Sequence, residues 1–154
     1  MALTFKTIVA AAELDDDLVN AILESAVRLA EAFDANLHVV DVVTPMKDFE
    51  TPHAMDALEH DLEAHHKIGE QRLDQLTSLV ANLMPAARAD VIYGDPGRAV
   101  ADYARENNAD LLVIGSHQKG WWETMTKGAV SPELIRESPC AVFVVTKAVA
   151  RMMA

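Results

Sequence analysis

Short apolar runs alternate along the chain with longer segments whose apolar residues recur every three or four positions. The longer segments have the spacing of helices that bury one side, and they span residues 14–33, 54–84 and 95–108. Residues 133–138 are expected to lie in a fourth, last helix. The apolar runs have the length of buried strands, and they span residues 7–12, 36–43, 87–94, 109–115 and 141–145. The pattern therefore predicts five strands separated by helices.

Strands that alternate with helices indicate one fold class. A helix between two strands lets the second strand run parallel to the first through a right-handed crossover. We therefore expect an α/β fold with a single-domain, open, doubly wound, five-stranded parallel sheet of the Rossmann-like kind. We expect the domain to span residues 1–147 and the C-terminal tail, residues 148–154, to fray.

Three local signals refine the helices. The aspartates at 15–17 fall at the start of the first helix, where carboxylates favour the positive end of the helix dipole. Gly69 interrupts the second helix and predicts a bend or a break there. In the third helix, Asp95 fits the N-cap and Pro96 fits the first helical position.

The acidic composition narrows the class of partner. The formal net charge is −11, which argues against nucleic acid and against anionic membrane surfaces. No apolar run reaches the roughly 18 residues of a membrane span, and the N-terminal segment lacks the pattern of a signal peptide. We therefore expect a cytoplasmic protein. The single cysteine, Cys140, cannot form an intrachain disulfide, and we favour a buried structural thiol over a catalytic one.

Ligands of doubly wound sheets bind at the carboxyl ends of the strands, at the point where the strand order reverses. We expect the first and fourth strands to flank this switch point. The candidate ligand-binding residues are therefore Ala12, Glu13, Val42 and the loop that begins at Gly115. The first loop lacks G-x-G-x-x-G and the chain lacks G-x-x-x-x-G-K-[ST], so neither a dinucleotide fingerprint nor a P-loop is indicated.

Four stretches of the sequence resemble one known family. They are "KTIVAAAE" in the opening strand, "NLHVVDVV" after the first helix, "GDPGRAVADYARENNADLLVIGSH", and the closing "SPCAVFVV". With these stretches the chain resembles the universal stress proteins over nearly all of its length. The resemblance implies a five-stranded parallel sheet and a homodimer formed through the last strand, Ala141–Val145. It also implies, as in many members, a site for ATP or a related adenine nucleotide.

The nucleotide-binding members have a loop of the form G-x2-G-x9-G-[ST], and this chain keeps half of it. Gly115 and Gly128 fill the first and third positions, but Gln118 and Ala129 replace the second glycine and the hydroxyl. Gln118 carries a Cβ that resists a positive φ, and Ala129 removes one donor to phosphate. The Ser-Pro that follows predicts a later helix start, with Ser131 as its N-cap.

Further candidate contacts lie in this loop and after the first strand. His117 and Val130 belong to the loop, and His117 either contacts phosphate or holds the loop by a hydrogen bond. The family's acidic residue after the first strand corresponds best to Glu13, with Ala12 fitting almost as well. The pair Trp121–Trp122 has a structural interpretation, as a cover for the end of the sheet, and a second one as a contact for a protein partner.

Two functions remain open from the sequence. We favour a dimeric stress-adaptation or signalling module without tight ATP binding, because of Gln118, Ala129 and Pro132. The alternative is an adenine-nucleotide switch that binds ATP or AMP and changes its dimer or partner surfaces. The spacing reveals no nucleophile–base pair and no convincing set of metal ligands, so we expect neither enzymatic activity nor a metal site.

Overall fold

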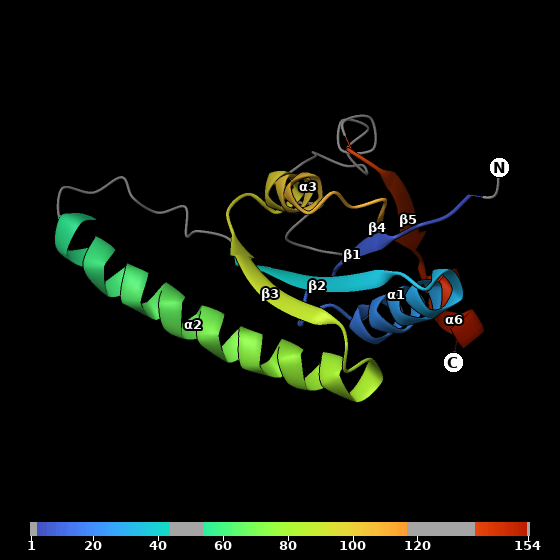
Figure 1. Ribbon diagram of the computed structural model, residues 1–154. Helices are drawn as coiled ribbons and strands as arrows, with labels where there is room; N and C mark the ends of the chain where they lie inside the picture. The colour runs from blue at the N-terminus through green and yellow to red at the C-terminus, as the bar shows by residue number, and fades with distance from the viewer. Residues whose placement is uncertain (1–2, 44–53, 117–137, 154) are drawn as a thin grey trace.

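The computed structural model describes residues 3–43, 54–116 and 138–153, which form a five-stranded sheet with helices on both faces (Figure 1). The strand order is β3-β2-β1-β4-β5, and all neighbouring strands run parallel. The expected doubly wound α/β fold is confirmed. The strands are β1 Thr7–Ala11, β2 Asn36–Val43, β3 Arg88–Tyr93, β4 Leu111–Gly115 and β5 Ala141–Val145.

The described helices divide unequally between the two faces of the sheet. Three of them, α1, α2 and α6, lie on one face, and α3 lies on the other (Figure 1). The longest, α2, extends beyond the sheet at its N-terminal end (Figure 1). The helices are α1 Val19–Phe33, α2 Ala54–Leu83, α3 Pro96–Glu106 and α6 Lys147–Met153. Residues 133–137 of the predicted fourth helix lie outside the described residues.

Each strand shares its side chains between two cores, one on each face of the sheet. In β1, Ile8 and Ala10 belong to the core beneath α1 and α2, whereas Val9 and Ala11 belong to the core beneath α3. All four residues are at most 4% exposed. Because both faces are covered, the strands appear in the sequence as continuous apolar runs rather than as alternating ones.

The acidic segment at 15–17 does not start a helix, which corrects the prediction. Helix α1 begins at Val19, and its first turn contains no acidic residue. The carboxylate of Asp16 instead accepts a hydrogen bond from the backbone N–H of Leu18, with Oδ1 at 2.7 Å. Asp16 is 8% exposed, so this side chain organises the turn between β1 and α1.

Gly69 marks close packing, and the predicted break in α2 does not occur. The helix continues through Gly69 from Ala54 to Leu83. A Cβ at this position would lie 2.0 Å from the hydroxyl oxygen of Tyr93 on β3. The missing side chain therefore lets a tyrosine of the sheet edge approach the helix backbone.

The start of α3 and the C-terminal segment provide one confirmation and one correction. Asp95 is the N-cap of α3, with its carboxylate accepting the N–H of Arg98 at 3.4 Å, and proline follows it as predicted. The tail was expected to fray, but residues 147–153 form α6. Val149 and Ala150 pack against the core beneath α1, which explains why this short segment is ordered as a helix.

Candidate functional site

The switch point of the sheet lies between β1 and β4, as the sequence predicts. Strand β1 pairs with β2 on one side and with β4 on the other, so the strand order reverses there. The pairing of Ala10 with Val113 places Gly115, at the end of β4, level with Ala12. Residues that follow β1 therefore lie at the same edge of the sheet as the ends of β2 and β4.

The predicted candidates that the structure describes differ in what they can offer a ligand. The side chain of Ala12 is buried in the core, and its N–H donates to the carbonyl of Val40 at 2.9 Å. Val42 packs against the core beneath α3. Glu13 is half-buried and is the first residue after β1 with a polar side chain. Of these three, Glu13 has the group that can select a ligand.

Most of the predicted phosphate loop falls outside the described residues. Of that loop, the structure describes Gly115 and the serine after it. The roles proposed from sequence for the rest of the loop and for its two tryptophans therefore stay predictions. The residues concerned are His117, Gln118, Trp121, Trp122, Gly128, Ala129, Val130 and Ser131.

Arg72 of α2 joins three elements at the switch point. Its Nη1 lies 2.8 Å from Oδ2 of Asp41, at the end of β2, and its Nη2 lies 2.8 Å from Oδ2 of Asp15, in the turn after β1. The Asp41 side chain is fully buried, whereas the Asp15 side chain is 78% exposed. The two ion pairs are therefore unequal: loss of the buried one leaves a buried charge unpaired, whereas the exposed one contributes at most about 1 kcal/mol.

Sequence reasoning missed Asp41 and Arg72, although β2 contains a signal. Every second residue of β2 faces the core beneath α1 and α2, beginning with Leu37 and Val39, and Asp41 occupies the next such position. A carboxylate on the buried side of a strand requires a partner. The strand thus indicates that a cation covers it, but the sequence does not say which of the cations in the helices does so.

Four carboxylates act on one another in this region, and we call them the acidic cluster: Glu13, Asp15, Asp16 and Asp41. Two of them, Asp15 and Asp41, pair with the Arg72 guanidinium. Burial raises the pKa of the Glu13 carboxyl, and the charges of Asp41 and Asp16 raise it further, against a smaller opposing effect of Arg72. Burial also raises the pKa of Asp41, although its hydrogen bond and ion pair with Arg72 act in the opposite direction. The cluster is therefore under mutual repulsion and is compensated only in part.

Two oxygens of the acidic cluster are buried with no hydrogen-bond partner in the part of the chain that the structure describes. They are Oδ2 of Asp16 and Oδ1 of Asp41. The carboxylate of Glu13, for its part, makes no hydrogen bond or ion pair with any described residue. An unsatisfied buried acceptor costs about 1–3 kcal/mol. The cluster thus has spare capacity to accept hydrogen bonds from a donor.

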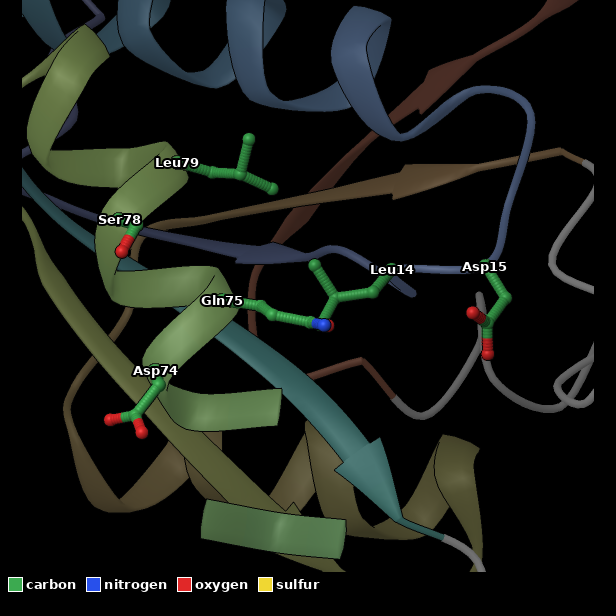
Figure 2. A pocket seen from close by; sticks show the side chains of 6 residues that line it. All are labelled: Leu14, Asp15, Asp74, Gln75, Ser78 and Leu79. Carbon is green, nitrogen blue, oxygen red and sulfur yellow. The ribbon is translucent and has the colours of Figure 1, made fainter. Parts of the chain in front are cut away.

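A groove of about 530 Å³ lies beside the acidic cluster, between α2 and the turn after β1 (Figure 2). Asp15 belongs to both the groove and the cluster. In Figure 2 the side chains of Leu14, Gln75 and Leu79 extend into the same space from the two sides. The groove is lined by Leu14, Asp15, Asp74, Gln75, Ser78 and Leu79.

Other candidate chemistry is limited in the part of the chain that the structure describes. Cys140 is half-buried, its thiol lies 3.9 Å from the hydroxyl of Ser138, and burial raises its pKa, which disfavours the reactive thiolate. Within residues 3–43, 54–116 and 138–153 no three or more His, Cys, Asp or Glu side chains are placed to hold a metal. None of the described helices is both long and apolar enough to cross a membrane.

Comparisons with known proteins agree with the fold and the sequence stretches. The profile of the universal stress protein family matches residues 4–146. A curated universal stress protein from Thermus aquaticus, from the 3′ region of a QAH/OAS sulfhydrylase gene, is 30% identical over 142 residues, which cover 92% of this chain and 98% of that one.

Solved structures show the same architecture. Universal stress protein UspA from Lactobacillus plantarum has a TM-score of 0.70 at 24% identity, covering 94% of this chain and 99% of that one. A universal stress protein solved in complex with cAMP has a TM-score of 0.60 at 21% identity, covering 93% of this chain and 98% of that one. The match over residues 4–146 decides the assignment: the chain belongs to the universal stress protein family.

Proposed function

We propose that this protein is a cytoplasmic, non-enzymatic stress-adaptation module that acts as a dimer and does not hold ATP or AMP tightly. The observation that carries the proposal is the acidic cluster at the switch point. Among the described residues, the charges of Asp15, Asp16 and Asp41 act on Glu13, and the one cation in this region, Arg72, is already paired with Asp15 and Asp41. An adenine nucleotide would add phosphate charge of the same sign to this region.

Arg72 is poorly placed to compensate such a ligand. To bind phosphate through both Nη atoms, it would have to leave Asp41, whose side chain is fully buried. Breaking a buried ion pair on one side costs roughly 3–5 kcal/mol because the remaining charge stays buried. The loss of the loop glycine at Gln118 and of the hydroxyl at Ala129 supports the same conclusion from the sequence.

The dimer is proposed to form along β5. This strand lies at the edge of the sheet, and its sequence, AVFVV, contains no charged or polar residue. A second copy could continue the sheet there by pairing its own β5. The pair Trp121–Trp122 remains a proposed contact for a protein partner.

A second function is favoured by one specific similarity. The fold matches a universal stress protein whose structure was solved in complex with cAMP. Glu13 also follows β1 at the position where the family's acidic residue is expected. On this alternative, the protein is a switch controlled by an adenine nucleotide, and Glu13 accepts hydrogen bonds from the ligand.

Calorimetric titration separates the two functions. The protein is unfolded, freed of small molecules, refolded, and titrated with ATP, AMP and cAMP at physiological salt. We expect no saturable heat; micromolar affinity for any of the three would contradict the proposal. The variant Gln118→Gly with Ala129→Ser restores the family loop, so binding gained by this variant would assign the loss to the loop rather than to the acidic cluster.

A further inference from the structure

The groove beside the acidic cluster combines an apolar wall with an acidic end. Leu14 and Leu79 provide aliphatic surface on its two sides, and Leu79 remains 37% exposed. Asp15, a member of the acidic cluster, lines one end of the groove. Glu13, a second member, directly precedes the lining residue Leu14 in the chain. Figure 2 shows Leu14 on the turn facing the α2 side chains. A ligand that fits both parts needs an aliphatic portion and a positively charged donor.

The described residues leave acceptors of the acidic end unsatisfied. Oδ2 of Asp16 and Oδ1 of Asp41 are buried with no hydrogen-bond partner among them, in residues that are 8% and 1% exposed. The backbone N–H of Val42 is a further described group that favours the charged form of Asp41, besides Arg72. The charges of Asp16 and Asp41 act on Glu13, which is itself unpaired among the described residues. These observations indicate a negative potential that the described groups compensate only in part, and a small cation with N–H donors would reduce it.

Arg72 shows which chemistry this region accepts. Its aliphatic stem leaves α2 and its cationic head lies between Asp41 and Asp15, with the side chain 26% exposed. An alkyl chain that ends in a cation is therefore already accommodated at the cluster, in the form of this side chain. Among the described residues, the carboxylate of Glu13 has no such partner.

We propose that the groove and the acidic cluster bind a linear aliphatic amine, with its ammonium group on the carboxylates of Glu13 and Asp15. Its methylene chain would lie against Leu14 and Leu79 in the groove. A metal ion suits the region less well, because the described carboxylates do not converge closely enough for three of them to hold one ion. The inference rests on the proposed absence of tight nucleotide binding, since a bound nucleotide would contact Glu13 and exclude the amine.

The test uses 1,4-diaminobutane as the probe, at constant ionic strength, followed by calorimetry and by amide chemical shifts. We expect saturable binding with shifts confined to the turn after β1 and the adjoining part of α2. Glu13→Gln is expected to weaken binding about tenfold through loss of one charge-assisted hydrogen bond. Leu79→Ser, an exposed change that spares the core, is expected to weaken it about threefold through loss of apolar contact.

Asp102→Asn is the matched control, because it removes one carboxylate from α3, on the opposite face of the sheet, where Asp102 is exposed and pairs with Arg105. It is expected to leave the affinity unchanged. An equal loss in Asp102→Asn and Glu13→Gln would show general charge attraction and overturn the proposal. Absence of saturable binding to the folded wild-type protein would overturn it as well.

Two further readouts distinguish a ligand site from a structural cluster. Arg72→Gln removes the internal cation, so diamine affinity is expected to rise; an unchanged or lower affinity in a folded variant contradicts the proposal. Affinity should also fall as the pH is lowered through the raised pKa of Glu13, since protonation removes the acceptor charge. Titration of ATP into the same sample tests the proposed function separately: ATP binding would overturn that function, whatever the diamine does.

Discussion

The two edge strands of the sheet differ in the side chains that flank their unpaired backbone groups. Strand β3, at one edge, carries Arg88 and Asp90 and is tied to α3 by a polar network. Strand β5, at the other edge, consists of apolar residues alone. Charged residues discourage a further strand from pairing, whereas an uncharged apolar edge invites one. The difference is consistent with the proposed dimer, in which β5 pairs with a second copy and β3 ends the sheet.

The network at β3 fixes the direction of each of its hydrogen bonds. Oδ2 of Asp90 lies 2.9 Å from Nε of Arg88 and 2.5 Å from the hydroxyl of Tyr103. The tyrosine has one hydroxyl hydrogen, and it goes to the carboxylate, which accepts only. Nδ1 of His38, 3.1 Å from the same hydroxyl, must then be the donor. Strands β2 and β3 and helix α3 are thereby joined through one tyrosine.

The backbone of β5 leaves two residues free to pair outward. The carbonyl of Val145 accepts the N–H of Ser116 at 2.9 Å, so Val145 faces β4. Because the N–H and C=O of one residue point to the same side in a parallel strand, Val142 and Val144 face away from β4. These two residues offer the donors and acceptors that a second β5 would use.

The largest expected effect comes from a proline in that outward-facing position. Val144→Pro removes one outward N–H without touching the ladder to β4, so the sheet should remain folded while dimer pairing is lost. By symmetry each dimer loses the donor twice, which raises the dissociation constant on the order of tenfold to hundredfold. Light scattering over a concentration series measures this change.

Val91→Pro provides the control at the other edge. The N–H of Gly94 donates to the carbonyl of Val43 at 3.2 Å, so the residues of β3 that alternate with Val91 face β2. Val91 itself faces outward, as Val144 does on β5. The same substitution here should leave the oligomeric state unchanged. A protein that is monomeric before any substitution, or that dissociates equally with either proline, would refute the assignment of β5.

A smaller effect, on stability, is expected from Tyr103→Phe, which alters the polar network at the β3 edge. The change removes the hydroxyl from both of its hydrogen bonds and leaves Nδ1 of His38 without an acceptor. We expect the free energy of unfolding in urea to fall by about 1–2 kcal/mol. Tyr93→Phe, on the same edge, removes a hydroxyl with no hydrogen bond to a described residue and should change little. Equal effects would mean that the network adds no stability.

The strands were predictable from the sequence almost to the residue, because burial on both faces leaves a continuous apolar signal. Strands β2 and β5 have the predicted bounds, and β1 ends one residue earlier than expected. The position of the switch point followed, since strand order in such folds places the first strand in the middle. Each strand is marked by a run of neighbouring apolar residues, so the sequence alone is enough to predict it.

Features that depend on contacts between distant elements could not be predicted in this way. Asp41 and Arg72 are 31 positions apart and meet only because α2 packs over β2. Gly69 suggested a bend, since a lone glycine in a helix reads as a breaker, but the reason for it is a tyrosine on another element. The helix of the C-terminal tail could not be predicted either, because its packing partner, α1, is far away in sequence.

The smallest expected effect is a pH dependence that originates in His38. Burial lowers the pKa of its imidazole, and the charge of Arg88 lowers it further, while Asp90 acts in the opposite direction. The folded protein therefore binds the proton less readily than the unfolded chain does. Stability from this group is present above the ordinary histidine pKa, about 6.5, and is lost as the pH falls through the lowered value.

His38→Asn isolates this contribution, because the side-chain amide can still donate to Tyr103 in place of Nδ1 but does not titrate. The difference in unfolding free energy between wild type and variant, measured in urea from pH 7.5 to 5, should move against the wild type as the pH falls. Glu13 and Asp41, whose pKa values are raised, act with the opposite sign at lower pH and cancel in the difference. A difference that stays constant with pH would show that His38 titrates alike in the folded and unfolded states, and it would contradict the lowered pKa.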